Sequence, residues 1–198
     1  MNYLIRNGQS YAVSGPSASY RGTNRSEPIY CEEFTEDHEI NQLYTWYLEE
    51  TGRSGFIHDL TKALRYVKLC NLHFPSKQFE LIQVTDGHST TNHGAGFLGF
   101  DISLGGNGDS LIFLALLSGP LKDIPQAPIA VLSNLVRCHF TPKLNEFGLF
   151  QMFEDASHCR KAMIALQSFH PNLYEGGNLE DFTVSGVYLL PQSEDGAT

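Results

Sequence analysis

The sequence lacks the motifs that mark common catalytic and nucleotide-binding sites. It has no G-x-S-x-G nucleophile motif, and the glycine-rich stretch Gly105–Gly108 contains neither that serine nor the lysine of a P-loop. A dinucleotide fingerprint also needs a strand–helix–strand context, which the residues around this stretch do not provide. The motifs therefore assign no enzyme class and no cofactor.

Long apolar runs and closely spaced cysteines are absent as well. The longest apolar run, Leu111–Leu117, is far too short to span a bilayer, so we expect no membrane segment. The first residues have no extended apolar core and no cleavage-site pattern, so we expect a cytoplasmic protein without a secretory signal. The four cysteines, at positions 31, 70, 138 and 159, are widely spread and are expected to be reduced and buried.

Charged residues are scarce and unevenly placed. They make up 18% of the chain, against 41% hydrophobic residues, and the 9 Tyr, 13 Phe and 18 Gly favour an ordered protein that contains a sheet. The net charge of −9 repels phosphate backbones, so we expect no nucleic-acid binding. Eight of the 22 acidic residues lie between positions 31 and 59, where Arg53 is the only Lys or Arg.

Apolar, β-prone segments bounded by Gly and Asp predict the strands. Phe79–Val84 and Phe97–Leu104 flank the polar loop Asp86–Gly96, and we expect them to form a long hairpin or a neighbouring pair at the centre of the only sheet. A further strand, Phe182–Leu190, is expected near the C-terminus. Shorter strands are expected at Tyr3–Ile5, Tyr11–Val13 and Ile29–Phe34.

Apolar residues at helical spacing predict the helices. These are a segment from Thr35 or Asp37 to Glu50, then Phe56–Leu72, Ser110–Leu117 (which could also be a strand), Ile129–Phe140 and Asp155–Phe169. The inward positions expected in the second helix are Ile57, Leu60, Leu64 and Val67, and those in the fourth are Ile129, Leu132, Leu135 and Val136. We therefore predict one α+β domain over residues 1–190, with a mostly antiparallel sheet covered by about four to five helices, and a disordered tail at 191–198.

The loop Asp86–Gly96 is one candidate site. Asp86, His88 and His93 could ligate a metal or act as general acid and base, although a solvated loop uses the same residue types for turn chemistry. Three Cys/His pairs elsewhere, at 70/73, 138/139 and 158/159, lack the spacing of a zinc site, because neighbouring helical residues point about 100° apart. We expect no metal.

The acidic helix is the other candidate. Its outward side is expected to carry five acidic residues and Trp46, which falls off the inner stripe of Ile40, Leu43 and Tyr47. The acids are Glu36, Asp37, Glu39, Glu49 and Glu50. They fit either a solvated face or a docking surface for a basic protein, with an exposed Trp46 as its anchor.

Four segments together resemble small acidic bacterial proteins of the toxin-immunity type. They are Phe79–Gly87, Gly94–Ser103, Leu144–Phe150 and Val184–Leu190, and the resemblance covers roughly the C-terminal two thirds. It implies a bacterial, cytoplasmic protein that binds a partner such as a cognate toxin, and it carries over no site residues. The first hypothesis is therefore an inhibitor that occludes a basic toxin surface, and the alternative is a small hydrolase or transferase that uses Asp86, His88 and His93.

Overall fold

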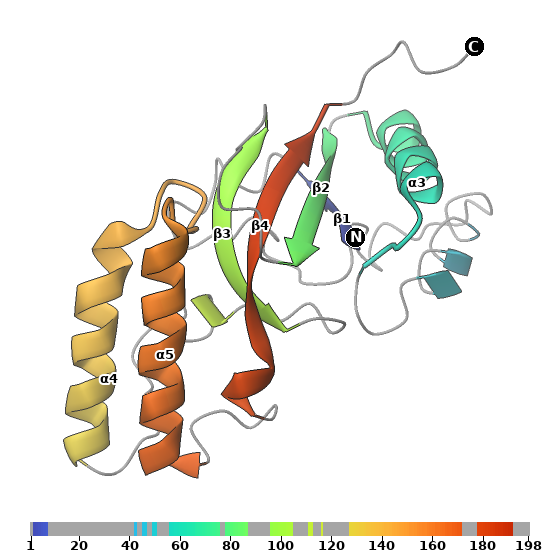
Figure 1. Ribbon diagram of the computed structural model, residues 1–198. Coiled ribbons are helices and arrows are strands. Elements are labelled where there is room, and N and C mark those ends of the chain that lie inside the picture. Colours follow the sequence, from blue (N-terminus) through green and yellow to red (C-terminus); the bar gives the residue numbers. More distant parts are fainter. Residues whose placement is uncertain are drawn as a thin grey trace.

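The sheet at the centre of the molecule has four antiparallel strands in the order β1-β2-β4-β3 (Figure 1). Its strands are β1 (Asn2–Asn7), β2 (Phe79–Asp86), β3 (Phe97–Leu104) and β4 (Phe182–Leu190). The structure, a computed structural model, describes residues 2–7, 42, 45, 46, 49, 50, 56–75, 78–86, 96–104, 111, 112, 116, 127–171 and 178–191. The α+β class, with an antiparallel sheet, is confirmed.

The expected pairing of β2 with β3, as a hairpin or as neighbouring strands, is wrong, because β4 lies between them. Both strands run antiparallel to β4 and are therefore parallel to each other, so the loop between them cannot make a simple hairpin. β4 takes the inner place because it is apolar on both sides, with Phe182 and Val184 on one face and Val187 on the other. The expected strand bounds of Phe97–Leu104 and Phe182–Leu190 are confirmed.

Three helices with complete bounds lie in the described part of the chain, so the expected four to five are not matched there. They are α3 (Leu60–His73), α4 (Ala127–Phe140) and α5 (Phe153–Phe169). Residues 42, 45, 46, 49 and 50 are helical too, as expected, whereas the expected strands Tyr11–Val13 and Ile29–Phe34 and the tail beyond Pro191 lie outside the described residues. None of the described helices is both long and apolar enough to cross a membrane.

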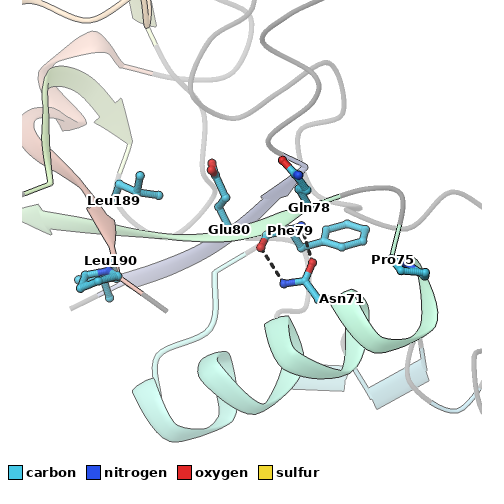
Figure 2. Close-up of a pocket in the computed structure, with 8 residues that line it drawn as sticks. Asn71, Pro75, Gln78, Phe79, Glu80, Leu189 and Leu190 are labelled. Carbon is cyan, nitrogen blue, oxygen red and sulfur yellow. Dashed lines mark hydrogen bonds between the residues drawn. The ribbon is translucent and has the colours of Figure 1, made fainter. Parts of the chain in front are cut away.

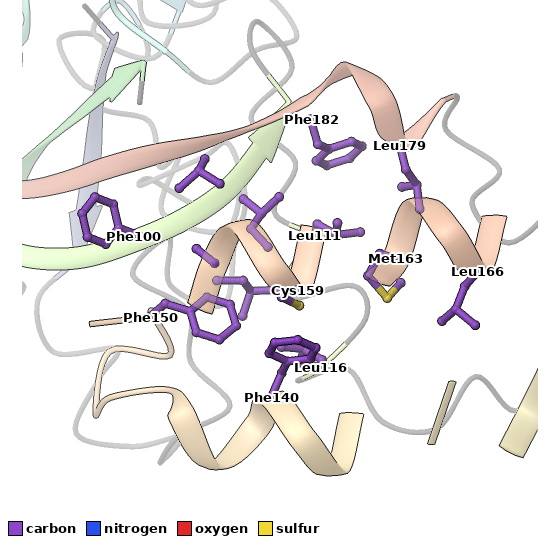
Figure 3. Packing of buried hydrophobic residues seen from close by; sticks show 14 residues of the cluster. Phe100, Leu111, Leu116, Phe140, Phe150, Cys159, Met163, Leu166, Leu179 and Phe182 are labelled. Carbon is purple, nitrogen blue, oxygen red and sulfur yellow. The ribbon is translucent and has the colours of Figure 1, made fainter. Parts of the chain in front are cut away.

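Two apolar clusters cover one face of the sheet at opposite ends. Near β1 and β2, the cluster contains Ile5, Leu81 and the inner residues of α3. Near β3 and β4, Phe100, Ile102 and Phe182 pack on α5, and Phe140 of α4 closes the cluster from outside (Figure 3). Strand register and side-chain alternation place both clusters on the same face.

The other face of the sheet carries a smaller apolar cluster. It contains Ile82, Val84 and Val187 from the strands, and Phe56 and Leu149 from outside the sheet. Figure 1 also shows that α3 lies at one end of the sheet, whereas α4 and α5 lie at the opposite end.

Val67 of α3 and Val136 of α4 contact the core as expected, but other residues that were expected to face inward do not. In α3 the buried residues are Ala63, Tyr66, Val67 and Cys70, whereas Leu60 and Leu64 are about two-fifths exposed, at 41% and 40%. In α4, Leu132 and Leu135 are exposed, and Val136 and Phe140 contact the core. Both helices are apolar on more than one side, so spacing alone does not decide which side packs.

Backbone groups on the outer edge of β3 are paired at Leu98, Phe100 and Ile102. Phe100 exchanges two backbone hydrogen bonds with Phe150, at 2.7 and 3.0 Å. The Asn145 side chain donates to the carbonyl of Leu98 at 2.7 Å, and the buried Asp101 carboxylate accepts from the backbone N–H of Ile102 at 2.8 Å. Such coverage prevents an edge strand from pairing with another chain.

Candidate functional site

Trp46 is half-buried, not exposed as the sequence suggested. Its indole ring lies 5.2 Å from the ring of Tyr66, centroid to centroid, and packs against the cluster of α3 and β1. Tyr66 is fully buried on the inner side of α3. Trp46 therefore joins the acidic helical segment to α3, which removes it as an exposed anchor for a partner.

Glu50 reinforces this attachment. Its carboxylate accepts a hydrogen bond from the ammonium of Lys62 at 2.8 Å, across the gap between the helical segment and α3. The hydrogen bond with Glu50 raises the pKa of Lys62, with the nearby charges of Glu50 and Asp59 in support and partial desolvation against. The Asp59 side chain caps α3 by accepting from the backbone N–H of Lys62 at 3.0 Å.

The outward side of the same segment is formed by Gln42, Thr45 and Glu49, which are all exposed. Their spacing of three and four residues places them on one helical stripe. Three of the expected partner-binding residues are described, and among these only Glu49 faces outward. Glu36, Asp37 and Glu39 lie outside the described residues.

The structure puts Asp86 at the end of β2, whereas His88 and His93 lie outside the described residues. In register, Asp86 pairs with Ser185 of β4, which in turn pairs with Asp101 of β3. Ser185 and Ser103 are buried and share a hydroxyl–hydroxyl hydrogen bond of 2.9 Å. We call Asp86, Ser185, Asp101 and Ser103 the polar row, which crosses three strands. Within it, the hydroxyl groups of Ser103 and Ser185 are hydrogen-bonded to each other.

A cavity of about 450 Å³ opens where β4 has ended and β2 begins (Figure 2). The Asn71 side chain takes the place of a strand there, since it accepts from the N–H of Phe79 at 2.6 Å and donates to its carbonyl at 3.0 Å. Glu80 is the only charged residue in the described lining, and Arg6 of β1 stands opposite it in register. The cavity thus offers a mixed lining in which the backbone N–H and carbonyl of Phe79 are already paired.

Three of the cysteines lie in the described part of the chain. Cys70 and Cys159 are buried in different clusters, and burial raises the pKa of each thiol to about 12. Cys138 is exposed on α4, contrary to the expectation that it is buried. The described residues contain no group of three or more His, Cys, Asp or Glu side chains that could hold a metal ion.

Sequence reasoning missed the polar row and the Trp46–Tyr66 contact. The row had a signal, because Asp101 and Ser103 alternate with apolar residues in β3 and so fall on one face. The Trp46–Tyr66 contact had no such signal, because Tyr66 was not among the expected inward residues of its helix.

Comparisons of the chain with protein-family models, with curated proteins and with solved structures found no match. The resemblance to toxin-immunity proteins remains an expectation drawn from the four segments named above. Any function must be inferred from the residues and their geometry.

Proposed function

We propose that this chain is a protein-binding inhibitor of the immunity type, which neutralises a bacterial toxin in the cytoplasm by occluding a basic surface. The charge distribution supports this function. A net charge of −9, with eight of 22 acidic residues between positions 31 and 59, attracts a cationic surface and orients it during encounter.

The observation that carries the proposal is the attachment of the acidic segment to α3. Trp46 packs on Tyr66 and Glu50 binds Lys62, so that Glu49, Gln42 and Thr45 face outward from a fixed support. A pre-organised acidic surface loses less conformational entropy on binding than a mobile one. This arrangement suits a protein that must recognise one partner.

The roles of the acidic helix residues differ from those expected from the sequence. Trp46 and Glu50 act as supports, and the contact residues are Glu49 together with Glu36, Asp37 and Glu39. Exposed charges give modest affinity at physiological salt, so these residues mainly raise the association rate.

The partner is to be captured from the native host with the tagged full chain and identified by mass spectrometry. We expect a basic protein that arrests growth when it is expressed alone, and growth should recover when this chain is co-expressed. Failure of the chain to restore growth, for every captured protein, would remove the inhibitor function.

The surface is then tested by association kinetics with the captured partner. Glu49→Lys should slow association several-fold and weaken its dependence on salt, because it reverses a charge within the contact surface. Glu146→Lys is the matched control, since Glu146 is an exposed acid on the loop beside β3 and gives the same change in net charge. Equal effects of the two variants would show that the helix is not the contact surface.

The polar row supports a second candidate, a small hydrolase or transferase that uses Asp86, His88 and His93. Asp86 pairs in register with the buried Ser185, next to Asp101 and Ser103, so the loop that carries both histidines starts at this row. A panel of chromogenic esters, phosphates and glycosides tests this candidate. Turnover by the wild type that is lost in His88→Ala and His93→Ala would favour the enzyme over the inhibitor.

A further inference from the structure

Helix α4 is apolar on two sides, and only one of them meets the rest of the described protein. Val136 and Phe140 contact the cluster formed with α5, β3 and β4. Val131, Leu132 and Leu135 point outward and are 57%, 41% and 61% exposed. A helix that is apolar on both sides is typical of a helix covered on both sides.

The outward residues form a continuous surface. Val131, Leu135 and Cys138 follow one another at spacings of four and three residues, so they lie on one stripe, with Leu132 beside it. We call these four residues the outer α4 stripe. None of them carries a formal charge, whereas on α3 the exposed leucines alternate with Lys62, Arg65 and Lys68.

The stripe lies at an extremity of the molecule. Figure 1 shows α5 between α4 and the sheet, and α3 at the opposite end. α5 runs back alongside α4, so that its last residue, Phe169, which is 77% exposed, comes to the end of the pair at which α4 begins. Phe169 is thus an exposed aromatic residue at that end of the helix pair.

We propose that the outer α4 stripe is the interface between two copies of this chain. The charge pattern selects a second copy as the occupant. Two chains of net charge −9 repel each other, but residues 124–145 contain no Asp or Glu. Their two cations are Arg137 and Lys143, and Lys143 is paired with Asp155, so two copies can meet here with little repulsion. A basic partner would find no carboxylate in this surface and is better matched by the acidic segment at the other end.

The geometry of the stripe suits two-fold symmetry. In an isologous dimer the same patch must complement itself, and residues four apart on one helix form ridges that fit between those of an identical helix at a crossing angle of about −50°. With Leu135 at the crossing point, Cys138 lies only about 4.5 Å away along the helix axis, at 1.5 Å per residue. The two Cys138 thiols therefore fall close to the symmetry axis.

The dimer is expected to be weak. A stripe of four side chains, even with Phe169, is smaller than the roughly 800 Å² per partner of a standard interface, so a dissociation constant on the order of 100 μM is expected. Sedimentation equilibrium of the full chain, from micromolar to millimolar concentration, should show the average mass rising from that of one chain towards that of two.

Two variants locate the interface, and a third is the control. Leu135→Glu and Val131→Glu introduce charges at exposed positions and should leave the chain monomeric at all concentrations with an unchanged circular dichroism spectrum. Leu64→Glu makes a similar change at a 40% exposed leucine on α3 and should dimerise like the wild type. A wild type that stays monomeric to 1 mM, or a dimer that survives both α4 substitutions or is lost in Leu64→Glu, would overturn the proposal.

Cross-linking gives a separate measurement. In a Cys31→Ser background, a short bis-maleimide should link two chains through Cys138, because Cys70 and Cys159 are buried, and Cys138→Ser should abolish the link. Absence of linked dimer at a concentration where the mass has risen would place the interface elsewhere. This inference is independent of the proposed function, since Leu135→Glu should bind the captured partner in solution as wild type does.

Discussion

Replacing Asn145 by alanine is expected to destabilise the protein, because its side chain holds the loop that covers β3. The Asn145 side chain makes three hydrogen bonds. It accepts from the N–H groups of Phe147 at 3.0 Å and Leu149 at 3.1 Å, and it donates to the carbonyl of Leu98 at 2.7 Å. These bonds fold residues 145–149 into a turn and attach that turn to β3.

The magnitude follows from the number and burial of these bonds. Each contributes about 0.5–1.5 kcal/mol net, and the loss of one partner leaves a backbone group without compensation. Three bonds in a half-buried setting give an expected loss of about 3 kcal/mol for Asn145→Ala. The same turn delivers Leu149 and Phe150 to the core, at 1% and 0% exposure, so loosening it also weakens apolar packing.

Urea unfolding followed by circular dichroism measures the loss directly. Asn134→Ala is the control, because Asn134 is exposed on α4 and its replacement should change the free energy of unfolding by no more than about 0.5 kcal/mol. Asn145→Asp keeps both accepted bonds and loses the donated one, so its loss should be intermediate. A loss below about 1 kcal/mol for Asn145→Ala would refute the reasoning.

Four further results are expected. Trp46→Ala should lower the free energy of unfolding by about 2 kcal/mol in the same urea assay, because it removes a half-buried ring from the α3 cluster, whereas Lys62→Ala should cost less than about 0.5 kcal/mol. Since the ordinary thiol pKa is 9.0 and burial raises it to about 12 in Cys70 and Cys159, unfolded thiols ionise first, so stability should fall as pH rises from 9 to 12, and less steeply in Cys159→Ala. Asp101→Ala should both destabilise the protein and promote aggregation seen by light scattering, because it uncovers the Ile102 N–H at the sheet edge. A chelator should leave the melting temperature unchanged, because the sequence lacks paired metal ligands, and a drop of several degrees would contradict that expectation.

The strands were predictable because their cause is local. Phe97–Leu104 and Phe182–Leu190 are β-prone runs with Gly or Asp at their limits, and the structure has the same bounds. The order of the strands was not predictable, because β2, β3 and β4 are similarly apolar and their order depends on pairing between residues about a hundred positions apart.

Two of the residues expected to face inward in α3 were mispredicted for one physical reason. Sequence reasoning turned Leu60 and Leu64 inward as the most apolar residues of α3, but the available space is filled by Ala63, Tyr66 and Cys70 on the neighbouring side. Tyr66 then offers a ring to Trp46, and the supposed contact residue becomes a support. Trp46 and Glu50, which were expected to face a partner, contact α3 instead.

The two ends of the sheet bear different surfaces, and this separation has a consequence for binding. The acidic segment is attached to α3, while the outer α4 stripe lies beyond α5 at the other end, so a dimer through α4 would hold two acidic surfaces far apart and both free. Two linked sites bind an immobilised partner more tightly than one, because the second event is intramolecular. When both are loaded above about 100 μM, where the wild type is expected to dimerise, the monomeric Leu135→Glu variant should therefore dissociate faster than wild type from a surface dense in partner, and at the same rate from a sparse surface. Equal rates on both surfaces would mean that the two ends of the molecule do not act together.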